Sequence, residues 1–288
     1  MAANEKQWSS ATPGLLIFLI DQSGSMTLPY EGGETRSQFA SKAVNRMIDN
    51  IIQANFNGDT PMEFWKLLAL YICSNTLSSL PWAIPFGEKE IQVIRSAVEQ
   101  YGDILSFAFS AEDVENNRKN GKISAIMTIE GPAGFNYNPE LLENLHQIGF
   151  RITTLGWNEQ NPLTGSCVTG GGLTEQGREY VRLAQKVGMV VDVSHISDEG
   201  FWDIIEITQK PILASHSNSR TLWNIPRNLT DEMYLAICKT GGTVGINLYS
   251  DFLGDNADID TVCNHIFHFL NLAGDDKHVS LGSDFDGM

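Results

Sequence analysis

The second half of the sequence alternates short apolar runs with longer amphipathic segments, and this alternation constrains the fold more than any other feature. After Gly121 the apolar runs that predict strands are 123–129, 151–155, 189–193, 211–214, 243–248 and 278–281. The segments that predict helices are 139–148, 174–187, 198–208, 230–239 and 259–272. Short strands that alternate with longer helices predict parallel βα units. The series predicts most of a TIM-like (β/α)₈ barrel in the α/β class, and an open doubly wound sheet is the alternative.

Polar side chains follow several of these predicted strands, at the point where each strand ends. The set comprises Glu130, Trp157, Asn158, His195, His216, Asn247, Asp284 and Asp286. In parallel α/β folds the carboxyl ends of the strands meet at one rim, where ligands and catalytic groups collect. One carboxylate and two imidazoles, from Glu130, His195 and His216, suit Zn²⁺ and leave room for water. Taken singly, a histidine at a strand end is more often a hydrogen-bonded structural residue than a ligand, Glu130 is compatible with a turn cap and Asp284 with a loop acid. Together on one rim, these residues favour a metal site.

The composition argues against several classes of partner. The formal net charge of -16 opposes binding to a phosphate backbone, so we predict no nucleic-acid partner. The 4 cysteines form no CxxC pair, which favours a reducing compartment over a disulfide framework. No apolar run approaches the roughly 18 residues of a membrane helix. We therefore predict no membrane segment and a cytoplasmic location.

The first part of the chain has a different character. The sequence predicts a buried strand over 14–21, then the motif DQSGSM over 21–26, then an amphipathic helix over 37–53. This opening resembles the start of a von Willebrand factor A domain, in which a DxSxS motif follows the first strand. The resemblance implies a Mg²⁺ site at Asp21, Ser23 and Ser25, because a carboxylate and hydroxyls suit a hard cation. A Ser/Gly-rich turn is the alternative, and the sequence after residue 61 does not continue the A-domain pattern.

Several motifs after Gly121 occur together in one known family. They are IEGP, TTLGWNEQN, GLTEQGREYVRLAQKVGMVVDVSHIS, KPILASHSNSR, PRNLTDE and GSDFDG, in this order along the chain. Together they resemble the membrane (renal-type) dipeptidase family, peptidase family M19, and the resemblance extends back to about residue 62. It implies a zinc metallopeptidase on a TIM-barrel-like, amidohydrolase-related scaffold. It further implies two zinc ions, dipeptide substrates, and a homodimer as the candidate assembly.

The resemblance also implies roles for individual residues. Glu130 matches a glutamate that bridges two metal ions, and His195 and His216 match the two histidines of the second zinc site. Asp284 matches the aspartate that handles the proton of the bridging water and of the leaving amine. Arg227 matches an arginine that binds the free carboxylate of the dipeptide, a task for which a guanidinium is well suited.

The sequence departs from the family pattern in three respects. Trp157 stands where some members have a substrate-contacting histidine, so that contact is lost or replaced. The family's first zinc depends on an HxD pair at the end of the first barrel strand, but this sequence has no histidine before His146. We therefore expect one intact metal site and impaired activity. The family pattern continues beyond Met288, so the expected barrel lacks its first strand and its C-terminal end.

The predicted organisation is a von Willebrand A-like fragment over 1–61 and a dipeptidase-like barrel over 62–288. A fusion of unrelated fragments near residue 61 is one explanation of the junction. In a second explanation, the predicted strand over 14–21 substitutes for the missing first strand and offers Asp21 and the serines to the metal. The predicted function is a zinc-dependent dipeptidase. The alternatives are a Mg²⁺-dependent von Willebrand A-like binding module and a catalytically inactive barrel.

Overall fold

The computed structural model describes residues 14–20, 65–73, 91, 94–96 and 98–284 of the chain. Its strands are β1 (Gly14–Ile20), β2 (Trp65–Cys73), β3 (Leu105–Phe107), β4 (Ile123–Glu130), β5 (Phe150–Thr154), β6 (Val190–Asp192), β7 (Leu213–Ala214), β8 (Thr243–Asn247) and β9 (Val279–Ser283). Its α-helices are α3 (Ala111–Lys119), α4 (Leu142–Ile148), α5 (Glu175–Val187), α6 (Asp198–Ile207), α7 (Asp231–Thr240), α8 (Ser250–Leu253) and α9 (Ile259–Ala273). Two 3₁₀ turns, Pro132–Phe135 and Pro139–Leu141, lie before α4.

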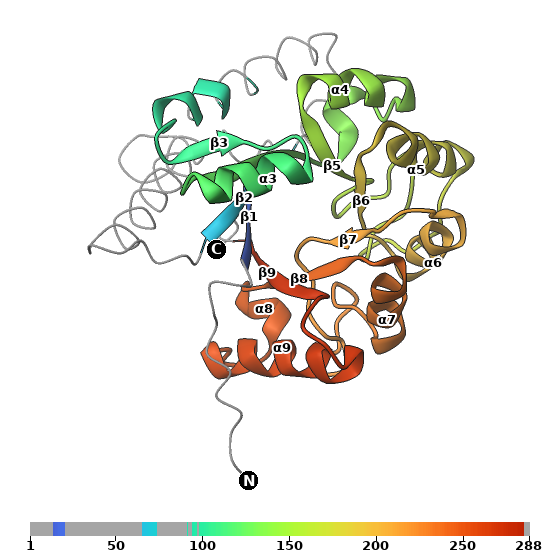
Figure 1. Cartoon of the computed structure of the whole chain (residues 1–288). Coiled ribbons are helices and arrows are strands. Elements are labelled where there is room, and N and C mark those ends of the chain that lie inside the picture. The colour runs from blue at the N-terminus through green and yellow to red at the C-terminus, as the bar shows by residue number, and fades with distance from the viewer. Residues whose placement is uncertain (1–13, 21–64, 74–90, 92–93, 97, 285–288) are drawn as a thin grey trace, which may run out of the picture.

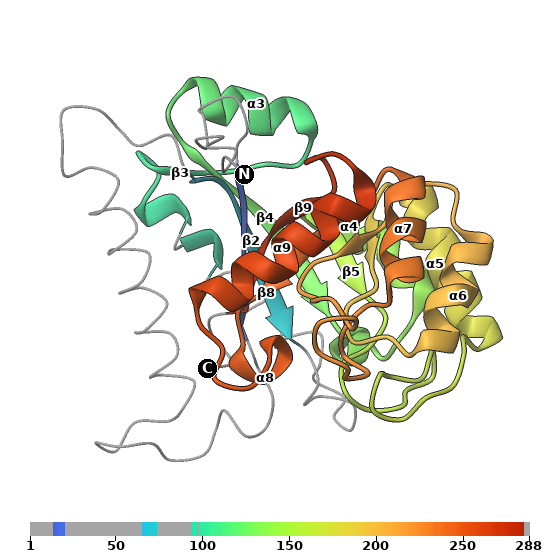
Figure 2. The same ribbon diagram turned by 90° about the horizontal axis from the view of Figure 1, so that it is seen from below.

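The strands form one parallel sheet that curves around the middle of the molecule (Figure 1). Its order is β1-β2-β4-β5-β6-β7-β8-β9, with β3 paired to β4 off this path. Figure 2 shows from another side how the ends of this path approach each other, and β9 lies beside β1. Among the described residues no hydrogen-bonded ladder joins β9 to β1. The fold is therefore an α/β, incomplete TIM-like barrel, as predicted.

The strand β1 belongs to this sheet because it pairs with β2 along its whole length. Residues 14–20 thus occupy the position before β2, as the explanation of a substitute first strand requires. Asp21, Ser23 and Ser25, the predicted Mg²⁺ ligands, lie outside the described residues, and so does the predicted helix over 37–53. The division of the chain at residue 61 stays a prediction.

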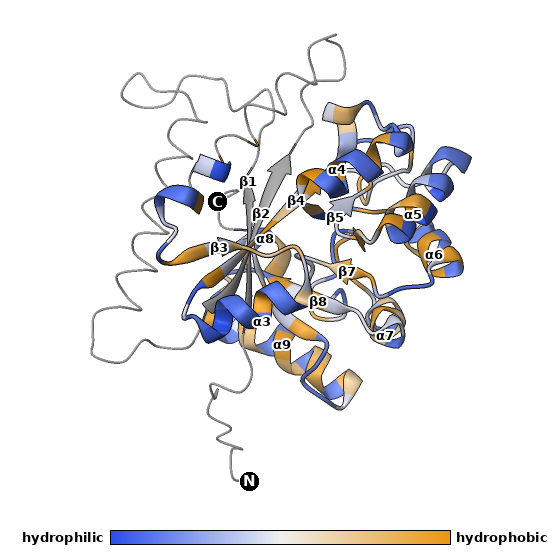
Figure 3. Ribbon diagram, turned by 45° about the horizontal axis from the view of Figure 1, so that its top comes forward, coloured by the Kyte–Doolittle hydropathy of each residue, from blue (hydrophilic) through white to orange (hydrophobic). Residues whose placement is uncertain are grey.

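The helices cover the outer side of the sheet with their apolar faces (Figure 3). In α5 the buried side chains include Tyr180, Val181 and Ala184, which recur at the spacing of one helix face. In α7 the buried Tyr234 stacks on Phe269 of α9 with ring centroids 4.2 Å apart. Such an aromatic pair contributes about 0.5–1.5 kcal/mol beyond its buried area. The core therefore lies between the strands and the surrounding helices, and it holds the strand ends in place.

Capping residues define where the helices begin and end. Thr174, Ser197 and Thr230 precede α5, α6 and α7, and each hydroxyl accepts a hydrogen bond from a backbone N–H of the first turn. Gly188 and Gly241 end α5 and α7 with φ of 97° and 81°, a conformation that favours glycine. Because each helix stops at a defined residue, the strand that follows enters the sheet a few residues later.

The predicted alternation of strands and helices after Gly121 is confirmed, with shifts of a few residues at the element ends. Of the predicted run 211–214, only Leu213–Ala214 forms a strand. Pro211 lacks a backbone N–H and cannot extend the ladder. β3 and α8 were not predicted, since both are too short for a periodic pattern. Within the described part of the chain, no helix is long and apolar enough to cross a membrane.

Candidate metal centre

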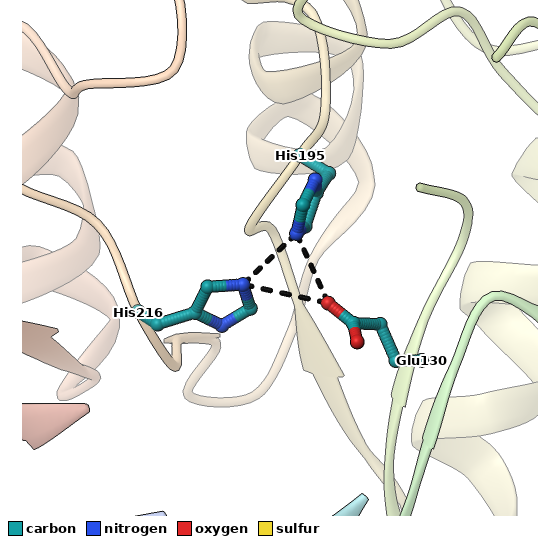
Figure 4. Close-up of side chains that lie close together, drawn as sticks. All are labelled: Glu130, His195 and His216. Atoms are coloured by element: carbon teal, nitrogen blue, oxygen red, sulfur yellow. Dashed lines mark hydrogen bonds and ion pairs between the residues drawn. The ribbon is translucent and has the colours of Figure 1, made fainter. Parts of the chain in front are cut away.

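The three predicted metal ligands come together from the carboxyl ends of neighbouring parts of the sheet. Glu130 ends β4, whereas His195 and His216 follow β6 and β7. Figure 4 shows the three side chains pointing toward one another. Oε1 of Glu130 lies 3.0 Å from Nε2 of His195 and 3.4 Å from Nε2 of His216, and the two Nε2 atoms lie 2.9 Å apart. The described residues contain this one group of acidic or imidazole side chains close enough to hold a metal ion.

Hydrogen bonds on the far side of each ring determine which nitrogen faces the cluster. Nδ1 of His195 donates to Oδ1 of Asn158 at 3.0 Å. Nδ1 of His216 lies 2.7 Å from Oγ of Ser215, which in turn donates to the carboxylate of Asp192. The single proton of the Ser215 hydroxyl is thereby used, so this oxygen accepts from His216. Both Nε2 atoms consequently present lone pairs to the cluster.

Burial and neighbouring charges set the protonation states of the cluster. Burial lowers the pKa of His195 to about 3, and the charge of Arg227 acts in the same direction. Burial alone would raise the pKa of Glu130, but a positive charge or an N–H donor facing it from the side of His195 and His216 outweighs burial and holds the pKa well below its usual range. At neutral pH His195 is neutral and Glu130 is a carboxylate, the forms that bind metals.

This arrangement fits a metal ion. Two imidazole lone pairs and a carboxylate repel one another at such distances unless a positive charge lies among them. His195 does not supply that charge at neutral pH, because its pKa is about 3. Oε1 of Glu130 is buried, and among the described residues no hydrogen-bond donor points to it. One carboxylate oxygen with two neutral imidazoles is a donor set suited to Zn²⁺ and related transition metals.

Arg227 is a buried cation with unused hydrogen-bonding capacity. Its side chain is 7% exposed, Nη1 donates to Oγ of Ser217 at 2.8 Å, and the guanidinium carbon lies 5.5 Å from the ring centroid of Phe252. Within the described residues, Nε and Nη2 have no hydrogen-bond partner. Burial lowers the pKa of Arg227, and the charges of Asp284 and Glu130 oppose this effect. Leaving buried donors of a charged group unpaired is costly, so the geometry favours an anion at this position.

Asp284 directly follows β9 and has a fixed orientation. Nδ2 of Asn247, the last residue of β8, donates to Oδ2 of Asp284 at 2.8 Å. The amide of Asn247 is itself oriented, because its Oδ1 accepts from the backbone N–H of Tyr249 at 2.6 Å. The charge of Asp284 acts on Arg227, which places both residues in one electrostatic environment.

Trp157 lies beside the cluster, as its position after β5 predicted. Its ring centroid is 6.1 Å from that of His195, and the two ring planes are tilted by 43°.

The side chains that support the cluster, Asp192 and Ser215, were not singled out from the sequence. Asp192 lies within the motif VDVSH and Ser215 within the motif ASHS, each at the end of a strand and close to a histidine. This closeness is the one sequence signal that could have drawn attention to them.

A parallel α/β barrel with a glutamate and two histidines at its carboxyl rim defines the class of barrel-type metal-dependent hydrolases. Comparison with known families agrees with this class. The family model described as membrane dipeptidase (peptidase family M19) matches residues 57–288, and the chain belongs to this family.

Relatives support the assignment, and a solved structure shares the fold. An uncharacterized dipeptidase of Schizosaccharomyces pombe is 30% identical over 240 residues, which cover 78% of this chain and 59% of the relative. A second one from the same organism is 36% identical over 211 residues, or 69% of this chain and 50% of the relative. The chain thus spans little more than half the length of these relatives. A metallopeptidase of Rhodobacter sphaeroides, liganded with a phosphinate mimic of the dipeptide L-Ala-D-Ala, shares the fold with a TM-score of 0.71 at 22% identity, covering 95% of this chain and 87% of that chain.

Proposed function

We propose that this chain forms the barrel of a zinc-dependent dipeptidase and that Glu130, His195 and His216 hold a metal ion. The observation that supports this most is the cluster itself, in which two imidazole lone pairs and an ionised carboxylate converge on one point. The donor set favours zinc over Mg²⁺, because imidazole nitrogen is a ligand of zinc whereas Mg²⁺ prefers oxygen. The family supplies the reaction class, hydrolysis of a dipeptide.

The protein side chains have distinct tasks in this proposal. A metal ion bound at the cluster would supply Lewis-acid polarisation of the peptide carbonyl and activation of water. Arg227 binds the free carboxylate of the dipeptide through Nε and Nη2, and so orients the peptide bond. Asp284, oriented by Asn247, accepts the proton of the attacking water and delivers it to the leaving amine. Trp157 lines the substrate site next to His195.

The recognition of a free carboxylate favours dipeptides over longer chains. A buried guanidinium can be neutralised only by an anion that enters the site, and in a dipeptide the carboxylate lies one residue from the bond to be cleaved. The corresponding dipeptide amide lacks this anion and would leave the donors of Arg227 unpaired. We expect activity to fall at least tenfold when the amide replaces the acid.

The number of metal ions is part of the proposal. The chain has no histidine before His146, so it does not contain the HxD pair on which a second zinc would depend. We infer one zinc per chain and impaired turnover. We also propose that the protein forms a homodimer and is located in the cytoplasm. The location is supported by Cys167, Cys238 and Cys263, which are free thiols in the structure.

The decisive experiment combines metal content with hydrolysis of a small panel of dipeptides. Asp284→Asn should keep the zinc and lose turnover by about 10²–10⁴-fold, since it removes a positioned proton carrier. Asp276→Asn, an exposed acid in the loop after α9, should match the wild type. A zinc-loaded Asp284→Asn protein with unchanged turnover would contradict the role of Asp284. Zinc binding by a wild type that hydrolyses no dipeptide would identify a catalytically inactive barrel.

A further inference from the structure

A buried chain of hydrogen bonds runs from β6 to the ring of His216. Asp192, the last residue of β6, is fully buried, and so are Ser215 and His216. Oγ of Ser215 donates to Oδ2 of Asp192 and lies 2.7 Å from Nδ1 of His216. The ring nitrogen on the other side, Nε2, faces the metal cluster shown in Figure 4. The carboxylate thus reaches the ring through one hydroxyl, not directly.

The donors around Asp192 decide the direction of these hydrogen bonds. Oδ1 of Asp192 accepts from the backbone N–H groups of Ser194 and Ser215, each at 3.0 Å. A backbone N–H can only donate, so Oδ1 of Asp192 is occupied by two backbone donors and Oδ2 is left to the hydroxyl of Ser215. This hydroxyl directs its proton to Asp192 and offers a lone pair to Nδ1 of His216. The geometry therefore requires a proton on Nδ1 of His216, and in the neutral imidazole Nε2 then carries the lone pair.

The neighbouring Ser194 supports the same geometry through the backbone. Its Oγ accepts from the backbone N–H of His216 at 3.1 Å and lies 3.3 Å from Oγ of Ser215. His216 is consequently held at its main chain by one serine and at its ring by the other. Backbone pairing between β6 and β7 contributes little to the position of His216, because it is limited to Asp192 opposite Leu213.

We propose that Ser215 and Asp192 are positioning residues that keep His216 in the tautomer and orientation required of a metal ligand. The inference rests on the proposed function, because it presumes that the cluster binds a metal ion. Partners of this kind orient ligating histidines in many metal sites, and their loss typically costs 10–100-fold in metal affinity. Here the hydroxyl of Ser215 links the carboxylate of Asp192, on β6, to the ring of His216, which follows β7.

Two variants test the link in different ways. Ser215→Ala removes the acceptor of Nδ1–H. Asp192→Asn keeps the size of the side chain but introduces an amide that can donate to Ser215, which frees the serine proton to turn toward Nδ1. Zn²⁺ affinity, measured by competition with a chromophoric chelator, should fall at least tenfold in both. Ser124→Ala, which removes a buried hydroxyl bonded to Asn117 away from the cluster, should stay within about twofold of the wild type.

The tautomer of His216 gives a readout that a purely structural role would not change. Long-range ¹⁵N–¹H spectra of histidine-labelled, metal-free protein should show a proton on Nδ1 of His216 in the wild type and none on Nδ1 in Asp192→Asn. Circular dichroism checks that each variant is folded. If Ser215→Ala does not fold, the result for Asp192→Asn decides the test. Failure of the wild type to bind Zn²⁺ would overturn the proposed function together with this inference. Wild-type binding with unchanged affinity in folded variants, or the absence of a proton on Nδ1 of His216 in the wild type, would overturn the inference alone.

Discussion

At the scale of the residue, two members of the site adopt backbone conformations that their residue types disfavour. His195 has φ of 69° and Asp284 has φ of 64°, in the left-handed region. For residues other than glycine this conformation costs about 1–2 kcal/mol each. The backbone carbonyl of His195 is held by the N–H of Cys167 at 2.7 Å, and the side chain of Asp284 by Asn247. Both side chains of the site are therefore held on a strained backbone by these hydrogen bonds.

His265 is a residue-scale determinant of acid stability. It is fully buried on α9, its Nδ1 accepts from the backbone N–H of Ser219, and its Nε2 donates to the carbonyl of Leu253, both at 3.0 Å. Burial lowers its pKa, the bond to Leu253 opposes this, and the charge of His268 adds to the lowering. The folded state therefore keeps His265 neutral at pH values where the unfolded chain binds a proton.

The sign of the pH dependence follows from this depressed pKa. The stabilisation is fully present above the unfolded pKa of about 6.5 and is lost as the pH falls below that value. Urea unfolding between pH 7 and pH 5 should show a pH slope that is smaller in His265→Gln than in the wild type by up to about 1.4 kcal/mol per pH unit. His278→Gln, at the half-buried residue before β9, serves as the control and should keep the wild-type slope. Parallel curves for the wild type and His265→Gln would contradict the prediction.

At the scale of the element, the close approach of three strands positions the residues before His216. A Cβ added at Gly245 of β8 or at Gly282 of β9 would lie far inside van der Waals contact with the backbone carbonyl oxygen of Ser215. The backbone N–H of Ser217 donates to the carbonyl of Gly245 at 2.8 Å. Two glycines thus allow the segment after β7 to pack directly against the neighbouring strands.

A methyl group at this contact should disturb both packing and the site. We predict that Gly245→Ala lowers the free energy of unfolding by about 1–3 kcal/mol, because overpacking displaces the segment that carries Ser215. The same variant should weaken Zn²⁺ binding. Val244→Ala, the adjacent buried position on β8, creates space instead of a clash and should lose stability with little change in Zn²⁺ affinity. Chemical unfolding and chelator competition measure the two effects, and equal losses of affinity in both variants would refute this explanation.

At the scale of the whole molecule, the metal cluster connects distant parts of the sheet. Glu130 on β4 is separated from β6 and β7 by β5, yet its carboxylate meets both histidines. A ligand held by all three side chains would therefore link β4 to the segments that follow β6 and β7. Because such a ligand binds only the folded state, it should stabilise the entire fold.

Zinc should accordingly raise the unfolding temperature. At free Zn²⁺ about 100 times its Kd, the expected gain is about 2.7 kcal/mol, measured by calorimetry against protein in excess chelator. Glu130→Gln, which keeps the shape but removes the charge of the ligand, should reduce this gain. Identical unfolding temperatures with zinc and with chelator would contradict a metal site at this cluster.

Much of the fold and part of the site could be predicted from the sequence. The alternation after Gly121 predicted the parallel sheet, because hydrophobic periodicity and capping residues are local signals. The same alternation placed Glu130, His195 and His216 at one rim, since parallel strands share the direction in which they end. The run 65–73 has no periodicity that distinguishes a strand from a helix, and only its pairing with β1 and β4 makes it β2.

The sequence by itself determined which residues have the chemistry for the site and which strands carry them. The tertiary structure alone decided how they face one another. The tautomer of His216 depends on Asp192 and Ser215, and the unpaired donors of Arg227 depend on burial, neither of which local sequence records. The reason is physical: periodicity reports which face of an element is buried, whereas hydrogen-bond direction and desolvation arise only when distant elements pack together.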